Sequence, residues 1–278
     1  MQPKLSIITI NYNNASGLYK TMQSVFDQTS KDFEFIVVDG NSTDGSKDII
    51  SQFVNDNYIG KYNLIGRFTF ISESDTGIYN AMNKGIRMAK GDYCQFLNSG
   101  DWLVSTDVTE QMLSNQPNAS ILYGNKLKVL TNRSFIHDKG MPNISMFTFY
   151  QGTINHCTAY IKRSLFDLYG MYDESLKIVS DWKFYLIAIA LHDEKVEYKD
   201  IDVCFFDMSG ISNSNKELAN DERRKVLEEL LPASVLIDYD RYAFAIEQSQ
   251  RLKRYWVTRN IFWITDRLLF KFEKLVLK

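Results

Sequence analysis

Asp39, Asp75 and Asp101 each stand at or shortly after the end of an apolar, β-rich stretch. Parallel strands place their carboxyl ends at one edge of a sheet, where open α/β proteins bind ligands, so we expect these carboxylates at one site. A single aspartate there often only caps a helix, but three at one edge favour a ligand site. Asp101, next to the small turn Asn98-Ser99-Gly100, would suit a divalent cation such as Mg²⁺ or Mn²⁺.

The chain between these acids alternates strand-type and helix-type patterns. This alternation predicts parallel βαβ units with right-handed crossovers, and therefore an α/β fold. The strand-type runs are residues 5–10, 33–38, 68–71 and 93–97, and helical apolar spacing covers residues 18–26, 49–54 and 78–89.

The first strand runs into Asn11-Tyr12-Asn13-Asn14, a loop-type cluster. Neither a G-x-x-x-x-G-K-[ST] loop nor a G-x-G-x-x-G turn follows this strand. We therefore expect a metal ion and scattered side chains, rather than a glycine-rich loop, to neutralise the phosphates of a bound nucleotide.

The second half contains two further candidate residues, Asp181 and His156. Asp181 opens a predicted helix, where an acid can cap the helix or act on a substrate, and both alternatives stay open. His156 is one of three histidines and can be a ligand or a packed polar residue. Around them we predict helices at 107–113, 164–168 and 217–231 and strands at 120–124 and 154–161, and residues 126–150 fit neither pattern.

The composition excludes several classes of protein. The 278 residues carry a net charge of −2, which gives no sign of nucleic-acid binding. Three well-separated cysteines indicate reduced thiols. The sequence contains neither a signal-peptide pattern nor a run of about 18 apolar residues. These features predict a cytoplasmic protein.

The last segment, residues 251–278, carries eight Lys or Arg residues and two acids, a net charge of +6, interleaved with apolar and aromatic residues. A basic amphipathic helix of this kind can lie on anionic lipid, which would make the protein peripheral on the inner face of the plasma membrane. The alternatives are packing on the protein's own domain or on a second subunit, as in a homo-oligomer. The predicted division is therefore a domain of residues 1–215 and a helical extension of residues 216–278.

Several sequence blocks resemble family 2 glycosyltransferases of the GT-A fold. The blocks are SIITINYN at 6–13, FIVVDGNSTDG at 35–45, SESDTGIYNAMNKG at 72–85 and FLNSGD at 96–101, with weaker support to about residue 215. The resemblance implies a mostly parallel, Rossmann-like sheet flanked by helices. Residues 1–101 would form a nucleotide-sugar half and residues 102–215 an acceptor half.

The same resemblance implies a role for each candidate residue. Asp101 would bind the metal ion, with Asn98 replacing one acid of the usual D-x-D pair. Asp181 would be the general base that an inverting transfer needs. The expected substrate contacts are Thr9, Asn11 and Tyr12 lining the nucleotide pocket, Asp39 accepting from the base, Asp75 and Lys84 at the ribose and diphosphate, Asn98 at the ribose or metal, and His156 orienting the acceptor or donor phosphate.

The expected activity is inverting transfer of a sugar from a nucleotide-diphospho-sugar, UDP-linked by expectation, to a glycan or lipid-linked acceptor in bacterial surface-polysaccharide synthesis. One alternative is a sugar-1-phosphate nucleotidyltransferase, but residues 11–17 lack the basic loop of that class. The other is a non-catalytic subunit that binds sugar nucleotides or acts as a scaffold, with Asn98 as a sign of lost activity. The sequence does not distinguish among donor sugars, acceptors or linkages.

Overall fold

The computed structural model describes residues 2–55, 58–61, 66–115, 117–130, 134–208, 210, 215–254, 260–261, 263–265 and 267. The chain divides into two compact units, Met1–Arg223 and Arg224–Lys278, which are described separately below. The predicted boundary after residue 215 falls within the first unit, directly before helix α10 (Lys216–Leu230).

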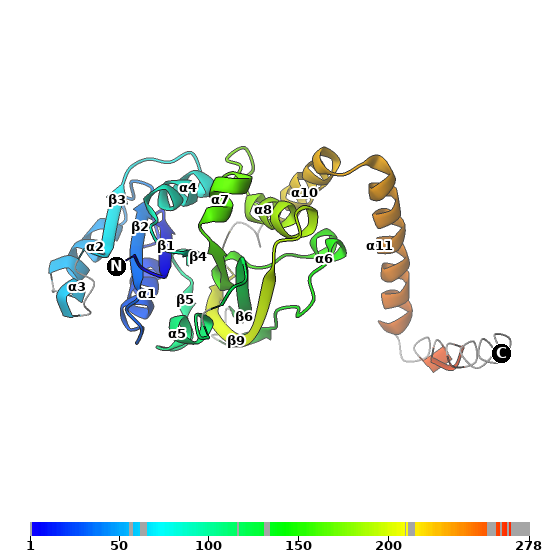
Figure 1. Cartoon of the computed structure of the whole chain (residues 1–278), viewed down its shortest axis with the longest axis horizontal. Helices are drawn as coiled ribbons and strands as arrows, with labels where there is room; N and C mark the ends of the chain where they lie inside the picture. The colour runs from blue at the N-terminus through cyan, green and yellow to red at the C-terminus, as the bar shows by residue number, and fades with distance from the viewer. Residues whose placement is uncertain are drawn as a thin grey trace. The chain divides into compact units, whose positions relative to one another are not determined.

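The predicted βαβ units form one half of a single sheet (Figure 1). Strand β1 (Leu5–Asn11) lies between β2 (Phe33–Asp39) and β4 (Tyr93–Phe96), and β3 (Phe68–Ser72) pairs with β2. All three of these pairings are parallel. The strands therefore end at a common edge, as the sequence predicts.

Both faces of this half-sheet are covered by helices, which explains why β1 and β2 are buried along their whole length. On one face Leu5 and Ile7 belong to the same core cluster as residues of α1 (Ala15–Phe26) and α2 (Ser46–Asn55). On the other face α4 (Ile78–Met88) packs so closely that a Cβ atom on Gly85 would lie 2.4 Å from Ile8 Cγ2. This contact requires glycine at that position of α4.

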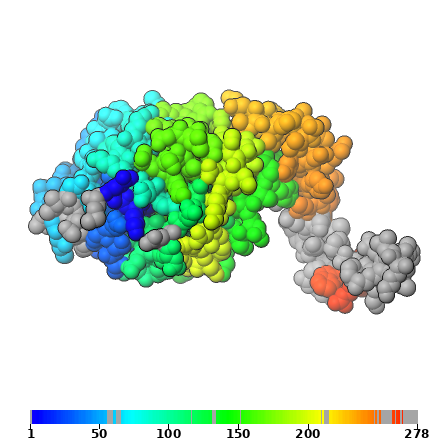
Figure 2. Space-filling view, viewed as in Figure 1, coloured from blue at the N-terminus to red at the C-terminus, as the bar shows by residue number. Residues whose placement is uncertain are grey.

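The second half of the sheet mixes parallel and antiparallel pairs. β8 (Ala159–Lys162) joins β4 and β6 (Ile121–Val129) antiparallel, and β6 runs parallel to β9 (Val196–Asp207). The short β5 (Trp102–Leu103) and β7 (Phe135–Asp138) pair antiparallel with β9 and β6. In the space-filling view the two halves form one continuous surface (Figure 2).

The prediction of a strand at 154–161 is wrong in its first part. Residues His156–Thr158 form a short 3₁₀ turn, η1, and the strand begins only at Ala159. The turn forms because the Asn155 side chain accepts a hydrogen bond from the Cys157 N–H at 3.1 Å. The remaining helical segments of this unit are α3 (Tyr58–Lys61), α5 (Val108–Met112), α6 (Met146–Gln151), α7 (Ser164–Tyr169), α8 (Ser180–Tyr185) and the π-helical segment η2 (Leu186–Leu191).

The second unit consists of the end of α10 and α11 (Ala233–Arg254). Arg224 donates to Glu228 at 2.6 Å and to Asp240 at 3.0 Å, which ties the two helices together. In the described part of the chain, no helix has both the length and the apolar character needed to cross a bilayer. Most of the basic tail at 251–278 lies outside the described residues; within it, Ile261, Trp263 and Ile264 are exposed.

Candidate functional site

Asp39, the last residue of β2, is a fully buried carboxylate surrounded by donors. Oδ1 accepts from Asn11 Nδ2 at 2.7 Å and from the Ser42 hydroxyl at 2.6 Å. Oδ2 accepts from the Ser42 N–H at 3.0 Å and from the Ser72 hydroxyl at 2.7 Å. Burial raises the pKa of Asp39, but these hydrogen bonds outweigh it and hold the pKa below its ordinary value. For Asp39 to accept from a nucleobase, some of these donors would have to give way.

Two other residues expected to line the nucleotide pocket, Thr9 and Tyr12, lie in opposite environments. Thr9 has no exposed surface, and its hydroxyl donates to the Leu97 carbonyl at 2.7 Å, which ties β1 to the end of β4. The Thr9 side chain is therefore used inside the sheet, and its expected contact with a nucleotide stays a prediction. Tyr12, by contrast, is 68% exposed at the strand ends.

Asp75 lies next to this group, as the parallel topology predicts. A Cβ atom on Gly40 would be 2.6 Å from Asp75 Oδ2 and 3.1 Å from the Tyr12 ring, so glycine permits the three segments to meet. Lys84, expected at the diphosphate, forms an ion pair with Glu73 at 2.9 Å and donates to the Ser74 carbonyl at 2.8 Å. Lys84 is thus held at the Glu73–Asp75 segment.

The turn Asn98–Asp101 is shaped by a glycine and a threonine. Gly100 has φ +107°, a conformation that favours glycine, and a Cβ atom there would lie 3.1 Å from Asp207 Oδ2. The hydroxyl of Thr21, on α1, accepts from the Gly100 N–H at 3.1 Å and donates to the Asp101 carbonyl at 2.7 Å. These contacts fix the direction in which the Asp101 side chain leaves the turn.

Asp101 is 4% exposed and differs electrostatically from Asp39. Its Oδ1 accepts from the Asp207 N–H at 2.8 Å, at the end of β9. Burial raises the pKa of Asp101 to about 7, and the nearby Asp207 carboxylate adds to this, against the lowering effects of His156 and Lys126. Asp101 is a carboxylate that the fold holds in an environment unfavourable to its charge.

A hydrogen-bonded chain joins this turn to the start of α8. Asn98 Nδ2 lies 3.1 Å from His156 Nε2, and His156 Nδ1 lies 3.3 Å from Asp181 Oδ2. His156 thus bridges the Asn98 amide and the Asp181 carboxylate. The Asn98 Oδ1 atom is buried and has no partner among the described residues. Residues predicted from separate motifs thus meet in one site.

Asp181 also contacts Tyr79, which the sequence analysis did not identify. The Tyr79 hydroxyl lies 3.0 Å from Asp181 Oδ1, and this oxygen also accepts from the Trp182 N–H at 2.9 Å. Burial raises the pKa of Asp181, but His156, Tyr79 and the Trp182 N–H outweigh it, so the pKa lies below its ordinary value. Asp181 is therefore ionised at neutral pH.

Asp207 and Lys126 are further site residues that the sequence analysis missed. Asp207 follows the apolar run 203–206, the same signal that marks Asp39, but the charged residues earlier in β9 hide the strand. Lys126 comes from the stretch that fitted neither pattern, and its charge acts on Asp101. In the segment that follows, residues 209 and 211–214 lie outside the described part of the chain.

The donor chemistry at Asp101 fits a divalent cation. Asp101 and Asp207 supply hard carboxylate oxygens, and a cation would relieve the repulsion that contributes to the raised pKa of Asp101. Within the described ranges, no group of three or more His, Cys, Asp or Glu side chains is arranged to hold a metal by itself. A cation here would need ligands in addition to Asp101 and Asp207.

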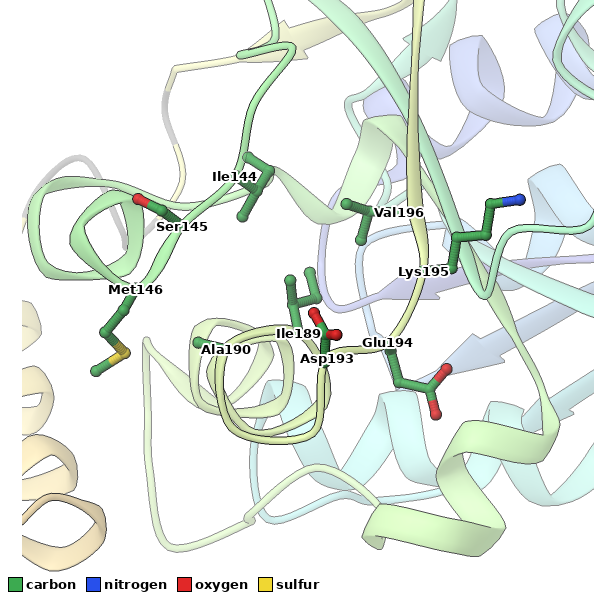
Figure 3. A pocket seen from close by; sticks show the side chains of 9 residues that line it. All are labelled: Ile144, Ser145, Met146, Ile189, Ala190, Asp193, Glu194, Lys195 and Val196. Atoms are coloured by element: carbon green, nitrogen blue, oxygen red, sulfur yellow. The ribbon is translucent and has the colours of Figure 1, made fainter.

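A cavity of about 460 Å³ lies elsewhere in the first unit, between the start of α6, the end of η2 and the start of β9 (Figure 3). Ile144, Ile189 and Val196 point toward it, whereas Glu194 and Lys195 point away. None of the predicted site residues lines this cavity. This cavity is therefore separate from the group of residues around Asp101 and Asp181.

The sequence profile of glycosyl transferase family 2 matches residues 6–165. A PGL/p-HBAD biosynthesis glycosyltransferase of Mycobacterium bovis (strain BCG / Pasteur 1173P2) is 28% identical over 216 residues, covering 76% of this chain and 80% of that protein. The uncharacterized glycosyltransferase Rv1514c of Mycobacterium tuberculosis (strain ATCC 25618 / H37Rv) is 31% identical over 221 residues, covering 78% and 80%.

Solved structures share the fold at lower identity. S. aureus TarS 1–349 in complex with UDP-GlcNAc has a TM-score of 0.63 and 18% identity, and it covers 81% of this chain. This chain spans 64% of that TarS chain, just under two thirds of its length. Mannosyltransferase PcManGT from Pyrobaculum calidifontis, in complex with GDP-Man and Mn²⁺, has a TM-score of 0.59 at 14% identity, covering 95% and 84%. These likenesses confirm the predicted GT-A fold.

Proposed function

The chain belongs to glycosyl transferase family 2, and we propose that it is an inverting transferase that uses a nucleotide-diphospho-sugar. The observation that carries the proposal is the chain Asn98–His156–Asp181, which joins the Asp101 turn to an ionised carboxylate at the start of α8. A diphosphate at Asp101 would lie on one side of the reacting carbon and an acceptor at Asp181 on the other. The donor we propose is UDP-linked, as in the UDP-GlcNAc complex of TarS. The other solved structure, PcManGT, is in complex with GDP-Man, so the panel of donors must include both nucleotides.

In this mechanism Asp181 is the general base. Its carboxylate takes the proton of the acceptor hydroxyl as the oxygen bonds to the anomeric carbon, while the bond from that carbon to the diphosphate oxygen breaks on the opposite face. The lowered pKa of Asp181 keeps the group ionised at neutral pH and so able to accept a proton, while it also makes the carboxylate a weaker base than an ordinary aspartate. His156 holds the second carboxylate oxygen and orients the group.

The departing diphosphate requires positive charge on the other side of the site. Mg²⁺ or Mn²⁺, held by Asp101 together with Asp207, would offset that charge. Among the chain's own groups, Lys84 is proposed to approach the diphosphate and Asp75 the ribose, with Asn11, Tyr12 and Asp39 near the nucleoside. Asn98, whose buried Oδ1 has no hydrogen-bond partner among the described residues, is proposed to approach the ribose or the metal.

The acceptor we propose is a glycan or lipid-linked precursor in cell-surface polysaccharide synthesis. Family membership alongside a glycosyltransferase of PGL/p-HBAD biosynthesis supports this class. The exposed side chains of Ile261, Trp263 and Ile264 and the net charge of the tail support contact with the inner face of the plasma membrane. Docking of the tail on a second subunit is the alternative, and flotation with anionic or neutral vesicles separates the two.

The test is turnover of a panel of nucleotide-sugars by wild type, Asp101→Ala and Asp181→Ala, with Mn²⁺ present. We expect one donor to be consumed by wild type, and both variants to lose at least about 100-fold in kcat. Full activity in both variants would overturn the assignment. If wild type binds nucleotide-sugars but consumes none, the proposal is replaced by the non-catalytic alternative. The neutral Asn98 in place of an acid would be consistent with that alternative.

A further inference from the structure

We propose that Tyr79 and Glu222 are positioning residues that hold the base Asp181 in place from two sides, through the Ile178 peptide. The inference rests on the proposed role of Asp181. The residues before Asp181 have no regular structure of their own, and the first residue flanking α8, Val179, has no side chain that could cap the helix. Other elements must therefore fix the position of Asp181 at the start of α8.

Glu222, from a distant part of the chain, binds the backbone of the turn that precedes α8. Its carboxylate is 8% exposed and accepts from the N–H groups of Lys177 at 2.7 Å, Ile178 at 3.0 Å and Val179 at 3.3 Å. Three successive backbone donors on one carboxylate lock the conformation of the turn that enters α8. Since Asp181 follows two residues later, this turn sets the position of its Cα atom.

Tyr79, on α4, holds the same peptide from its other end. Its hydroxyl donates to the Ile178 carbonyl at 2.6 Å and lies 3.0 Å from Asp181 Oδ1. Burial raises the pKa of Tyr79 well above its ordinary value, so the hydroxyl keeps its proton and remains a donor. One hydroxyl thus shares its hydrogen between a backbone carbonyl and the base, which fixes the side chain of Asp181 relative to its own backbone.

Helix α4 is also hydrogen-bonded to two residues of the segment that precedes α8, Tyr172 and Glu174. Asn83 donates to the Tyr172 carbonyl at 2.9 Å and accepts from the Tyr172 N–H at 3.0 Å. Asn80 and Asn83 both donate to the Glu174 carboxylate at 2.8 Å. Because α4 begins three residues after Asp75, the helix connects the proposed donor contacts to the position of the base.

Asp181 is faced by groups from several elements. Besides Tyr79 they are His156 on η1, Arg223 on α10, and the buried hydroxyls of Tyr172 and Tyr185. The Tyr79 hydrogen bond lowers the pKa of Asp181, so removing the hydroxyl raises this pKa. The acidic limb of the kcat/KM profile, which follows ionisation of the base, must then move to higher pH.

The experiment compares Tyr79→Phe, Glu222→Gln and Glu222→Ala with two matched controls. Tyr169→Phe removes another tyrosine hydroxyl that donates to a carboxylate, Glu194, at 2.7 Å. Glu34→Ala removes another buried carboxylate that accepts backbone N–H groups, from Lys90 and Gly91, at the opposite edge of the sheet. The readouts are release of nucleoside diphosphate from the donor that wild type consumes, the pH profile, Tm, and the shift in Tm with UDP and Mn²⁺.

We expect Tyr79→Phe and Glu222→Ala to lower kcat by about 10- to 100-fold, as a misplaced catalytic group does. KM for the donor and the UDP-induced shift in Tm should stay within about twofold of wild type, because the nucleotide contacts are untouched. Glu222→Gln, which keeps one accepting oxygen, should recover part of kcat, and Tyr79→Phe should move the acidic limb upward. The two controls should lower Tm without these kinetic effects.

The inference is wrong if kcat of the three variants stays at the wild-type value. It is also wrong if kcat falls only as far as in controls of equal Tm and the acidic limb of the pH profile does not move. Asp181→Asn separates this failure from failure of the proposed function. If Asp181→Asn retains turnover, Asp181 is not the general base and the proposed function is wrong. If Asp181→Asn loses turnover but the Tyr79 and Glu222 variants keep the wild-type rate, only the positioning role is excluded.

Discussion

Asp39 and Asp101 are both buried acids at the carboxyl ends of parallel strands, separated only by β1, yet their environments are opposite. Asp39 accepts four hydrogen bonds from Asn11, Ser42 and Ser72, and its pKa is lowered. Asp101 accepts one, from the Asp207 N–H, faces a second carboxylate, and has its pKa raised to about 7. The first carboxylate organises the strand ends, and the second has the perturbed electrostatics that we propose a ligand relieves.

The comparison is tested most strongly by the chemistry of Asp101. We expect Asp101→Asn to lower kcat by about 1000-fold, because an amide lacks the charge proposed to bind the cation. The measurement is steady-state turnover with saturating Mn²⁺. Retained Mn²⁺-dependent turnover in this variant would mean that Asp101 is not needed to bind the cation.

The same substitution should stabilise the protein in metal-free buffer at pH 8. The native state holds the Asp101 proton up to about pH 7, whereas the unfolded chain releases it near pH 4, so this residue lowers the free energy of unfolding as pH rises between those values. We expect Asp101→Asn to be more stable than wild type by about 3 kcal/mol at pH 8 and by little at pH 4.5. Urea unfolding at both pH values with a chelator measures the difference, and an equal gain at both would contradict the raised pKa.

Asp39→Asn should do the reverse and destabilise the fold by about 2 kcal/mol at pH 7, since an amide cannot accept from all the donors that surround Asp39. The lowered pKa means that the contribution of Asp39 is present above pH 4 and is lost as pH falls through its folded pKa. The deficit of Asp39→Asn relative to wild type should therefore shrink in acid. A deficit that grew below pH 4 would exclude the assigned direction.

The smallest effect is expected for Ser72→Ala, which removes a single donor to Asp39 at 2.7 Å. The cost should be about 1 kcal/mol, because the other donors remain. Differential scanning calorimetry of Ser72→Ala, Asp39→Asn and the double variant gives the coupling. Additive effects would show that Ser72 does not act through Asp39.

The first half of the fold could be predicted because its signals are local. Residues 5–10 and 33–38 are β-rich, and each strand ends at a polar residue that marks the sheet edge, so the positions of Asn11, Asp39 and Asp101 follow from chain order alone. The general placement of Asp181 at a helix start could be predicted for the same reason.

The remaining parts of the site depend on contacts between distant residues. Asp207 meets Asp101 across 106 positions, and Glu222 meets Ile178 across 44, so no periodicity reveals them. Tyr79 has the spacing of an ordinary core residue of α4, and only the packed structure aims its hydroxyl at Asp181. Sequence alone also does not show that the Thr9 hydroxyl bonds inside the sheet, because a polar residue near a strand end can do this or line a pocket.

The pairing of β5 with β9 has a consequence for the order in which the protein acquires its reactive centre during synthesis. Trp102 and Leu103 pair with Phe205 and Cys204, about 100 residues later in the chain. The amino-terminal half can fold on the ribosome as it emerges, since its strands pair with neighbours. Asp101 meets the Asp207 N–H only after β9 has been made, so a nascent chain holds the proposed nucleoside contacts before the carboxylate proposed to bind the cation is in place.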